Sequence, residues 1–504
     1  MTERHALVIG AGLAGAAVCA ALARRGWRLN LLDAASGPAE GASALPVGML
    51  SPHVTRAPTP LSRLSDLGVA DMRAELQRLV PQGAGWVDCE VDNRGHAPGR
   101  WPAALVRPAA LVQAWLAEAA ARTPLQARWN AEVAQLRFDA ATGRWQALDN
   151  SGQPLAEAPT VVVASAFGSL ELLLHGAEQT AASLPLRPVQ GQMSLAALDD
   201  APLAERPQRD NGVFVPVYED SGLPPRWPRR IWAMGSTYER GRTSCELSAQ
   251  AHQRNADSLQ ALCPPAAERM AQAMAQGHLL GWAQVRCASL DRLPLMGALP
   301  RLDQLDVHMQ AAGVRRGRVP LAAVPRWPGL YTLSALGSRG LTLSHWCATQ
   351  LARQMDGLPA EVAEADQDLI NALDPARFAW KQARRQPTAV NGDIVAAMLD
   401  NEATVADPET DKTILAAHAA VFSAMVDHLN RADRRGNARY LGPEGEETNR
   451  RIFADIGGRG YFERFRVELP PADVLLVGAE VAEQVRTAEL VVERSGADRA
   501  LDHD

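Results

Sequence analysis

The sequence predicts an α/β fold in which a Rossmann-like domain, built on a parallel sheet, is interrupted by a mixed-sheet domain. Three observations support this prediction. Residues 5–33 follow the pattern strand, glycine-rich turn, helix, strand, and residues 329–351 follow the pattern strand, glycine-rich turn, helix. Between them, residues 127–148 alternate apolar and polar side chains, as strands with one buried face do. A chain of 504 residues has room for two or three domains.

The N-terminal unit is a complete strand–helix–strand repeat. Its first strand is the apolar run Ala6–Ile9, which suits a buried parallel strand. The helix is expected over Ala16–Arg25 and is followed by Gly26, a residue type that commonly ends helices. Leu29–Leu32 forms the second strand, with Asp33 at its end. This order of elements is typical of a βαβ nucleotide-binding unit.

Three glycines in the first turn have separate mechanical tasks. Gly10 permits the tight turn out of the strand, Gly12 leaves room for a pyrophosphate, and Gly15 lets the helix pack closely on the sheet. The phosphates would then lie at the positive end of the helix. Asp33 follows Gly15 by 18 residues, where a carboxylate can accept hydrogen bonds from an adenosine ribose. Within a complete βαβ unit, this pattern indicates a bound dinucleotide.

Two later segments favour FAD over NAD as that dinucleotide. Gly41-Ala42-Ser43, with Gly48, suits an extended cofactor that runs past the first unit. Gly329–Ser334 is a strand that leads to Gly337–Gly340 and a second helix beginning near Leu341. N–H groups at that helix start can face the flavin pyrimidine oxygen, where negative charge accumulates on reduction. An NAD enzyme needs no such late element.

The segments between these ends predict the substrate region. Helices are expected at residues 60–80 and 108–122, and strands at residues 184–194, 212–218 and 230–237. A further buried strand, Val161–Ala164, precedes Gly168 and is typical of a chain returning to the cofactor domain. The predicted boundaries are 1–85, 150–180 and 280–385 for a discontinuous FAD-binding domain, 86–149 and 181–279 for the substrate domain, and 386–504 for a C-terminal extension.

The C-terminal extension differs in composition from the rest of the chain. Residues 391–504 carry 13 basic and 22 acidic residues, a net charge of −9, whereas the whole chain has −6 and residues 1–390 therefore +3. Ile414–Leu429 has an amphipathic helix pattern and Val474–Val477 is a strand-like run, so an α+β segment is expected. The mildly basic remainder leaves an anionic partner open.

Composition also limits the class of protein. Hydrophobic residues make up 47% and charged residues 21%, as in an ordinary globular enzyme. No run of 18 apolar residues occurs, which predicts no membrane span. The first residues enter a strand without the apolar core of a signal peptide, so a cytoplasmic location is expected. The six cysteines are never spaced as Cys-x-x-Cys, so neither a metal site nor a redox pair is predicted.

From residue 5 to about 385, the chain resembles the D-amino-acid-oxidase-like (DAO) flavoproteins, whose fold is similar to that of glutathione reductase. Within them, it is most similar to the FAD-dependent oxidoreductase half of the MnmC-type proteins, which are bifunctional tRNA 5-methylaminomethyl-2-thiouridine biosynthesis proteins. The matching segments are Gly41–Ser43 with Gly48, Val285–Ala288, Asp291–Gly297, Gly337–Leu341 and Leu373–Phe378. Two segments depart from the family pattern. Ala44–Val47 lacks an expected asparagine, and Ser344-His345 replaces a small residue and a proline.

The resemblance implies a reaction and partners. The substrate would be a tRNA wobble uridine, or 2-thiouridine, that carries a carboxymethylaminomethyl group. Hydride transfer from the carbon beside the secondary amine to flavin N5 would give an imine, and hydrolysis would release glyoxylate and leave an aminomethyl group. Molecular oxygen is the expected oxidant of the flavin, and the methyltransferase would be a separate protein. Two alternatives stay open: a small-molecule glycine or D-amino-acid oxidase or dehydrogenase, and a non-catalytic flavin-bearing binding protein.

The glycine-like carboxylate of that substrate calls for an arginine fork, and Arg286 and Arg339 lie within matching motifs. Tyr238 is a candidate for the pocket wall. The competing interpretations are a structural ion pair or flavin contact for each arginine, and simple packing for the tyrosine. His53 and His345 are weaker candidates for proton transfer, since no acid is paired with them in sequence. The cofactor-binding candidates are Gly10, Gly12, Leu13, Ala14, Gly15, Asp33, Ser43, Gly48, Val133, Gly168, Gly337, Ser338, Arg339, Gly340 and Leu341.

Two basic clusters are candidate phosphate contacts for RNA. The first is the segment 315–318, and the second is 377–385. In the second cluster, spacing of three and four residues would place the basic side chains along one helical face. A solvated basic face is the competing interpretation. The side chains of the second cluster are Arg377, Lys381, Arg384 and Arg385, with Phe378 and Trp380 between them.

Overall fold

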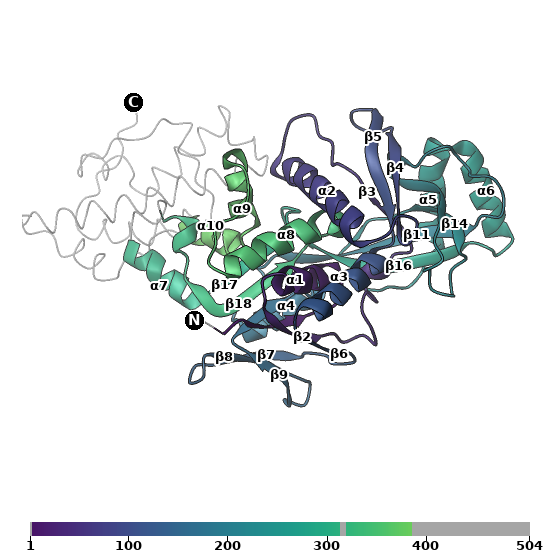
Figure 1. Ribbon diagram of the computed structural model, residues 1–504. Helices are drawn as coiled ribbons and strands as arrows, with labels where there is room; N and C mark the ends of the chain where they lie inside the picture. The colour runs from purple at the N-terminus through teal and green to yellow at the C-terminus, as the bar shows by residue number, and fades with distance from the viewer. Residues whose placement is uncertain (1–2, 313–318, 386–504) are drawn as a thin grey trace, which may run out of the picture. The chain divides into compact units, whose positions relative to one another are not determined.

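The computed structural model describes residues 3–312 and 319–385, and Figure 1 shows these residues in colour. The chain divides into two compact units. The first comprises Met1–Leu302 with Val324–Ala379, and the second comprises Asp303–Ala323 with Trp380–Asp504. The basic segment 315–318 and the whole extension 386–504, including its predicted helix and strand, lie outside the described residues. No helix among the residues that are described is both long and apolar enough to cross a membrane.

The first unit contains the predicted parallel sheet. All its neighbouring strands are parallel except β17, which pairs antiparallel with β18 at the edge. The sheet contains residues from both ends of the unit, as the two glycine-rich segments predicted. Its strands, in spatial order, are β17 (Leu295–Pro300), β18 (Arg326–Ser334), β10 (Thr160–Val163), β1 (His5–Ile9), β2 (Arg28–Leu32) and β6 (Leu125–Arg128).

Both faces of this sheet are covered, which explains why its central strands are apolar throughout. Ala6 and Val8 of β1 face one core, formed with helices α1 (Leu13–Ala23), α3 (Pro108–Arg122) and α8 (Gly340–Met355), which pack side by side in Figure 1. Helix α2 (Pro60–Leu79) packs against α8. Thr59 and Ser62 form a capping box that fixes the start of α2.

The opposite face of the parallel sheet packs on a second core. Leu7 and Ile9 of β1 contribute to it, together with Trp145. Helix α4 (Ser169–Gly176) and a three-stranded antiparallel sheet cover this face. The strands of that small sheet are β7 (Gln135–Asp139), β8 (Arg144–Leu148) and β9 (Pro154–Ala158).

A nine-stranded sheet forms the inserted region. It is mixed, because β4 and β12 pair parallel while its other pairs are antiparallel. Two consecutive helices, α5 (Ala249–Leu262) and α6 (Pro264–Ala275), cover part of it. Its strands are β3 (Gly48–Leu50), β4 (Trp86–Asn93), β5 (Gly99–Val106), β11 (Leu186–Ala197), β12 (Gln208–Asp210), β13 (Gly212–Glu219), β14 (Arg230–Gly235), β15 (Glu239–Arg240) and β16 (Leu280–Ser289).

These elements confirm the predicted fold class and the positions of its main helices and strands. The domain boundaries stay a prediction, but sheet membership assigns one segment differently. Helix α3 and strand β6 fall within residues 86–149, which were predicted for the substrate domain, yet β6 extends the parallel sheet beside β2. The alternating pattern of residues 127–148 produced the strands β7 and β8 of the small sheet instead. Periodicity identifies a strand but not the sheet that it joins.

The last elements of the described chain are short. Helix α9 (Gln367–Leu373) belongs to the first unit. Helices α7 (Leu302–Ala312) and α10 (Arg377–Arg385) cross the boundary between the units. Within the second unit, the Trp380 indole N–H donates to the Val319 carbonyl at 2.8 Å.

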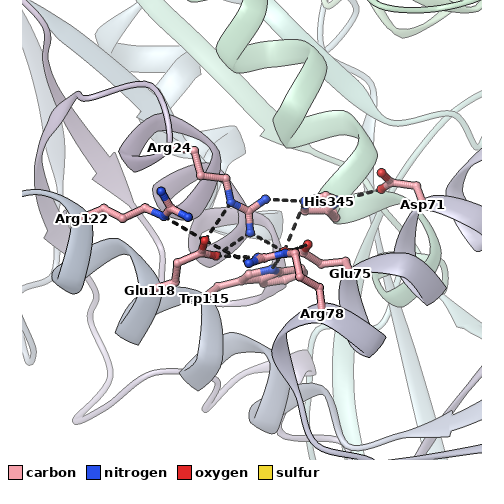
Figure 2. Close-up of polar contacts among 8 residues, drawn as sticks. All are labelled: Arg24, Asp71, Glu75, Arg78, Trp115, Glu118, Arg122 and His345. Atoms are coloured by element: carbon pink, nitrogen blue, oxygen red, sulfur yellow. Dashed lines mark hydrogen bonds and ion pairs between the residues drawn. The ribbon is translucent and has the colours of Figure 1, made fainter.

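The helices that cover the parallel sheet are joined by a group of polar side chains, which we call the helix network (Figure 2). Arg24 of α1 and Arg78 of α2 both contact the carboxylates of Glu75 and Glu118. His345 of α8 lies between Asp71 and Arg24, with its Nδ1 2.7 Å from Asp71 Oδ2 and its Nε2 2.7 Å from Arg24 Nη1. The members are Arg24, Asp71, Glu75, Arg78, Trp115, Glu118, Arg122 and His345.

Candidate active site

The first unit contains a cavity of about 1030 Å³ between the carboxyl ends of the parallel strands and the nine-stranded sheet. Every cofactor-binding candidate from the sequence lines it except Gly15. Arg286 and Tyr238 line it as well, and so does His53. The fold therefore brings together segments that are separated by as many as 330 residues, from Gly10 to Gly340.

Gly10 and Gly15 meet the geometric demands predicted for them, while the room for a pyrophosphate at Gly12 stays a prediction. Gly10 has φ +104°, and a Cβ there would lie 2.7 Å from the Ala164 carbonyl oxygen. A Cβ on Gly15 would lie 1.7 Å from the Gly10 oxygen, so Gly15 acts by close packing behind the cavity. A Cβ on Gly12 would lie 3.0 Å from Ser43 Oγ. A larger residue at any of these three positions would crowd the neighbouring atoms of the turn.

Polar side chains hold this turn in place. The Asp33 carboxylate at the end of β2 accepts from the backbone N–H of Ala11 at 2.5 Å and of Ala35 at 2.8 Å. Ser43 Oγ accepts from the Leu13 N–H at 2.9 Å. The carboxylate predicted to contact ribose thus also fixes the glycine turn, and each of its oxygens retains a second lone pair for a ligand.

Two helix N-termini converge on the cavity. Gly12, Leu13 and Ala14 open α1, and a Cβ on Gly340 at the start of α8 would lie 3.0 Å from Leu13 Cδ1. Gly337, with φ +57°, turns the chain into α8. Each N-terminus presents partial positive charge. One suits a pyrophosphate and the other suits a flavin ring that gains negative charge on reduction.

The other predicted cofactor contacts line the same cavity. Gly48 lies in β3, where a Cβ would meet the Leu341 side chain at 2.6 Å, so a larger residue would push β3 away from α8. Val133 follows β6, and Gly168 ends the short turn Ala166–Gly168 after β10. The residues present therefore fit an extended dinucleotide with a ring system at one end. Their individual contacts with the cofactor stay predictions.

Arg286 of β16 lies partly buried in the cavity wall, without a carboxylate partner in the described residues. It donates to Ser236 Oγ at 3.0 Å and to the Thr237 carbonyl at 2.7 Å, and its buried Nε–H has no acceptor. Burial lowers the pKa of its guanidinium below the usual range. Its place beside Gly191 depends on the missing side chain, because a Cβ there would lie 1.9 Å from Arg286 Nη2. Such a cation is prepared for an anionic ligand.

Arg339, the residue before α8, resembles Arg286 in this respect. It lines the cavity, and no hydrogen-bond or ion-pair partner of its side chain occurs in the described part of the chain. Burial, and then the charge of Arg292, lower its pKa. The structure thus removes the ion-pair interpretation for both arginines within the described residues. Which of them holds a substrate carboxylate stays a prediction.

Sequence reasoning missed a third arginine in the wall. Arg209 of β12 donates to Asn93 Oδ1 at 3.0 Å, to Ser51 Oγ at 2.6 Å and to the Pro52 carbonyl at 2.8 Å, all of which are neutral acceptors. No motif surrounds Arg209, and Ser51 precedes it by 158 residues, so no local signal identifies it. We call Arg209, Arg286 and Arg339 the pocket arginines.

The two histidine candidates have different surroundings. His53 lines the cavity, where burial and the charges of Arg339, Arg209 and Arg292 lower its pKa to about 4. It is therefore neutral at pH 7. His345 is held within the helix network and is not among the cavity-lining residues. Its contacts indicate a structural role rather than proton transfer.

One member of the predicted RNA cluster is wrong as a phosphate contact. Arg377 is only 2% exposed and pairs with Asp291 at 2.8 Å, and it also donates to the Leu293 and Pro294 carbonyls. It therefore holds the Asp291–Gly297 segment in place. Lys381 is exposed, and the Arg384 guanidinium lies 4.4 Å from the Trp380 ring centroid. The Arg385 side chain lies outside the described residues.

The family of FAD-dependent oxidoreductases called DAO matches residues 5–102 and 92–354 of this chain. The chain belongs to this family. Its cofactor is accordingly FAD, as the glycine pattern predicted, and it is an oxidoreductase. The cavity described above can hold FAD in a family member with this fold.

Curated relatives show a more specific similarity. A protein of Paracidovorax citrulli called tRNA 5-methylaminomethyl-2-thiouridine biosynthesis bifunctional protein MnmC is 37% identical over 416 residues, which is 71% of this chain and 58% of that protein. The protein of the same name from Verminephrobacter eiseniae is 35% identical over 75% of this chain and 64% of its own length. This FAD-dependent oxidoreductase thus spans about 60% of the relatives that it matches.

Solved structures with the same fold include amine-oxidising enzymes. Glycine oxidase from Geobacillus kaustophilus matches with a TM-score of 0.53 at 18% identity, over 74% of this chain and 99% of that one. L-Proline dehydrogenase from P. horikoshii matches with a TM-score of 0.53 at 11% identity, over 75% of this chain and 98% of the other. At these identities the comparison supports the fold of the oxidoreductase and not its substrate.

Proposed function

We propose that this chain oxidises the carboxymethylaminomethyl group on the wobble uridine of tRNA. The observation that carries the proposal is the partly buried Arg286, which has no carboxylate partner in the described residues and lies in the wall of an FAD cavity, in a chain similar to proteins named for tRNA 5-methylaminomethyl-2-thiouridine biosynthesis. The net charge of +3 for residues 1–390 is compatible with a polyanionic substrate.

Each part of the site has a task in this reaction. The guanidinium of Arg286, with Arg339 as the second candidate, binds the glycine-like carboxylate and thereby directs the adjacent CH₂–NH group into the cavity. FAD, when bound, supplies the acceptor for the hydride from that CH₂ group. Loss of the amine proton completes the imine, and water splits it into glyoxylate and the aminomethyl nucleoside. His53, neutral at pH 7, adds no competing charge.

We further propose that oxygen accepts the electrons from the reduced cofactor, that a separate methyltransferase acts on the aminomethyl product, and that the protein works in the cytoplasm. The wall of the cavity places no constraint on these partners. Oxygen consumption and hydrogen peroxide release during turnover test the first point, and an incubation with an added methyltransferase tests the second.

The deciding experiment incubates the FAD-loaded full-length protein with tRNA that carries the carboxymethylaminomethyl group and follows the nucleoside by mass spectrometry. Conversion to the aminomethyl nucleoside with equal release of glyoxylate supports the proposal. Unchanged tRNA, together with rapid oxidation of glycine, sarcosine or a D-amino acid, would identify a small-molecule oxidase. If neither tRNA nor any of these amines reduces the flavin, the protein is a flavin-bearing binding protein.

A further inference from the structure

Tyr238 combines two properties that rarely occur together. Its ring lines the cavity beside the partly buried Arg286, yet 48% of the residue is exposed. It is the aromatic member of the exposed large hydrophobic residues in the described part of the chain; the others are Leu247, Leu290, Val307 and Leu358. A tyrosine ring that lines a cavity while half of the residue is exposed can contact a ligand that extends from the cavity into solvent.

The strand pairing explains which side chains surround this ring. Arg240 lies in β15, and its guanidinium contacts the ring of Tyr238, which precedes that strand. Arg240 and Arg286 both pair with Val189, from opposite edges of β11. The strand register therefore places the guanidinium groups of Arg240 and Arg286 near the ring of Tyr238. Their Cζ atoms lie 5.8 Å and 5.3 Å from its centroid.

Those distances leave the ring accessible. Elsewhere in the first unit, the guanidinium lies 4.4 Å from the ring centroid for Arg377 on Phe378, 4.5 Å for Arg301 on Trp327 and 5.5 Å for Arg226 on Trp227, so the two contacts at Tyr238 are at the long end of this range. At Tyr238 the two cations flank the ring at longer range, in keeping with its large exposed area.

The charges around Tyr238 select the chemistry of a ligand. Arg240 is exposed and Arg286 is partly buried, and neither pairs with a carboxylate in the described residues. A solvent-accessible ring between two unpaired cations suits a ligand that has a flat aromatic group with a negatively charged group attached close to it. Unpaired nucleobases in RNA are bound in this way, by stacking on aromatic side chains with arginine contacts to phosphate. Glycine and sarcosine have no ring that could stack on Tyr238.

We infer that Tyr238 and Arg240 form a stacking platform for an unpaired base of the RNA substrate at the rim of the cavity. The base stacks on Tyr238, Arg240 contacts a flanking phosphate, and the side chain of the modified uridine extends past the ring to Arg286. Tyr238 and Arg240 are thus positioning residues for the substrate. The inference rests on the proposed function, since a nucleobase ligand presupposes an RNA substrate.

The test uses the FAD-loaded full-length protein and an anticodon stem-loop RNA with the carboxymethylaminomethyl group at the wobble position. Stem-loop binding is followed by fluorescence anisotropy and turnover by nucleoside mass spectrometry. Tyr238→Ala should weaken binding and raise KM by about 10- to 100-fold, the typical effect of losing one stacked base, with kcat and the flavin spectrum little changed. Tyr238→Phe should match the wild type. Arg240→Gln should weaken binding and reduce its salt dependence by about one counterion.

Leu358→Ala, at an exposed site after α8, is the matched control and should bind normally. Binding of sarcosine, which has no base, is measured from the flavin absorbance change and should be unaffected by Tyr238→Ala. If Tyr238→Ala lowers sarcosine binding as much as RNA binding, Tyr238 only supports Arg286 and the inference is wrong. If the wild type converts the stem-loop and Tyr238→Ala does so with the same KM, stacking is excluded while the proposed function stands. If the wild type neither binds nor converts the stem-loop, both fail.

Discussion

Arginine has opposite roles in two regions of the first unit. In the helix network, Arg24 and Arg78 each contact two carboxylates, and Arg122 pairs with one of them (Figure 2). The pocket arginines have only neutral acceptors, or none, among the described residues. The carboxylates that line the cavity, Asp33, Glu40, Glu132 and Glu171, make no ion pair with them.

The difference separates stability from function. In the helix network the carboxylates of Glu75 and Glu118 are buried and the arginines that pair with them are partly exposed, so these pairs hold helices together, and removing the arginines would leave buried carboxylates uncompensated. A buried cation without a partner costs the folded state free energy that a bound anion can recover. Replacing an arginine is therefore expected to reduce stability in the helix network and to reduce activity in the cavity. Four measurements test that contrast.

The largest expected effect is on stability, from Glu75→Ala in the helix network. Glu75 is 4% exposed and accepts from Arg24, Arg78 and the Trp115 indole. Its loss should lower the free energy of unfolding by about 3–5 kcal/mol, measured by urea denaturation. Glu361→Ala, which removes an exposed partner of Arg353, is the control and should change it by less than about 1 kcal/mol. Equal effects of the two variants would show that the network is not structural.

Arg286→Met should instead reduce activity. A substrate carboxylate that loses its charged partner should weaken transition-state binding by about 2–4 kcal/mol in kcat/KM. The free energy of unfolding should stay the same or rise, because a buried unpaired charge is removed. Steady-state kinetics and urea denaturation on one preparation measure both. A destabilised variant with full kcat/KM would place Arg286 with the structural arginines.

The helix network should also make stability depend on pH in the acid range. Burial opposes ionisation of Glu75 and Glu118, but hydrogen bonds from Arg78 and Arg24 outweigh it and lower the pKa of both to about 2 from a usual 4.5. A depressed carboxyl pKa stabilises the fold above the unfolded value, and this contribution is lost as pH falls from 4.5 towards 2. The urea midpoint should therefore fall between pH 5 and pH 3. In Glu75→Gln the fall should be shallower, and an identical slope would contradict the assignment.

The smallest effect is expected from Arg122→Met. Arg122 is half exposed, and its Nε lies 3.0 Å from Glu118 Oε1, but Arg24 and Arg78 still contact that carboxylate. The change should cost no more than about 1 kcal/mol of unfolding free energy and should leave kcat/KM unaltered. Since Arg286→Met makes the same chemical replacement, the pair shows whether surroundings or residue type decide the outcome. A loss above 2 kcal/mol would mean that the network acts as one unit.

The sequence by itself determined the cofactor half of the site. Gly10, Gly12, Gly15 and Asp33 lie within one βαβ unit, where each residue's task follows from local geometry: a positive φ, a close helix approach, the end of a strand. The late segment Gly337–Gly340 was predictable for the same reason, since it joins a strand to a helix N-terminus. Such patterns can be read because the residues that interact are neighbours in the chain.

Only the tertiary structure decided the roles of the arginines. Arg209 meets Ser51 across 158 residues, Arg286 needs the space above Gly191 in another strand, and Arg377, predicted for a basic surface, is buried against Asp291. Motifs drew attention to Arg286 and Arg377, but the local sequence does not show whether a carboxylate lies beside either of them. Whether a guanidinium has a carboxylate beside it depends on contacts between distant segments, and local periodicity does not predict those contacts. The desolvation of that charge depends on the packing of the whole unit.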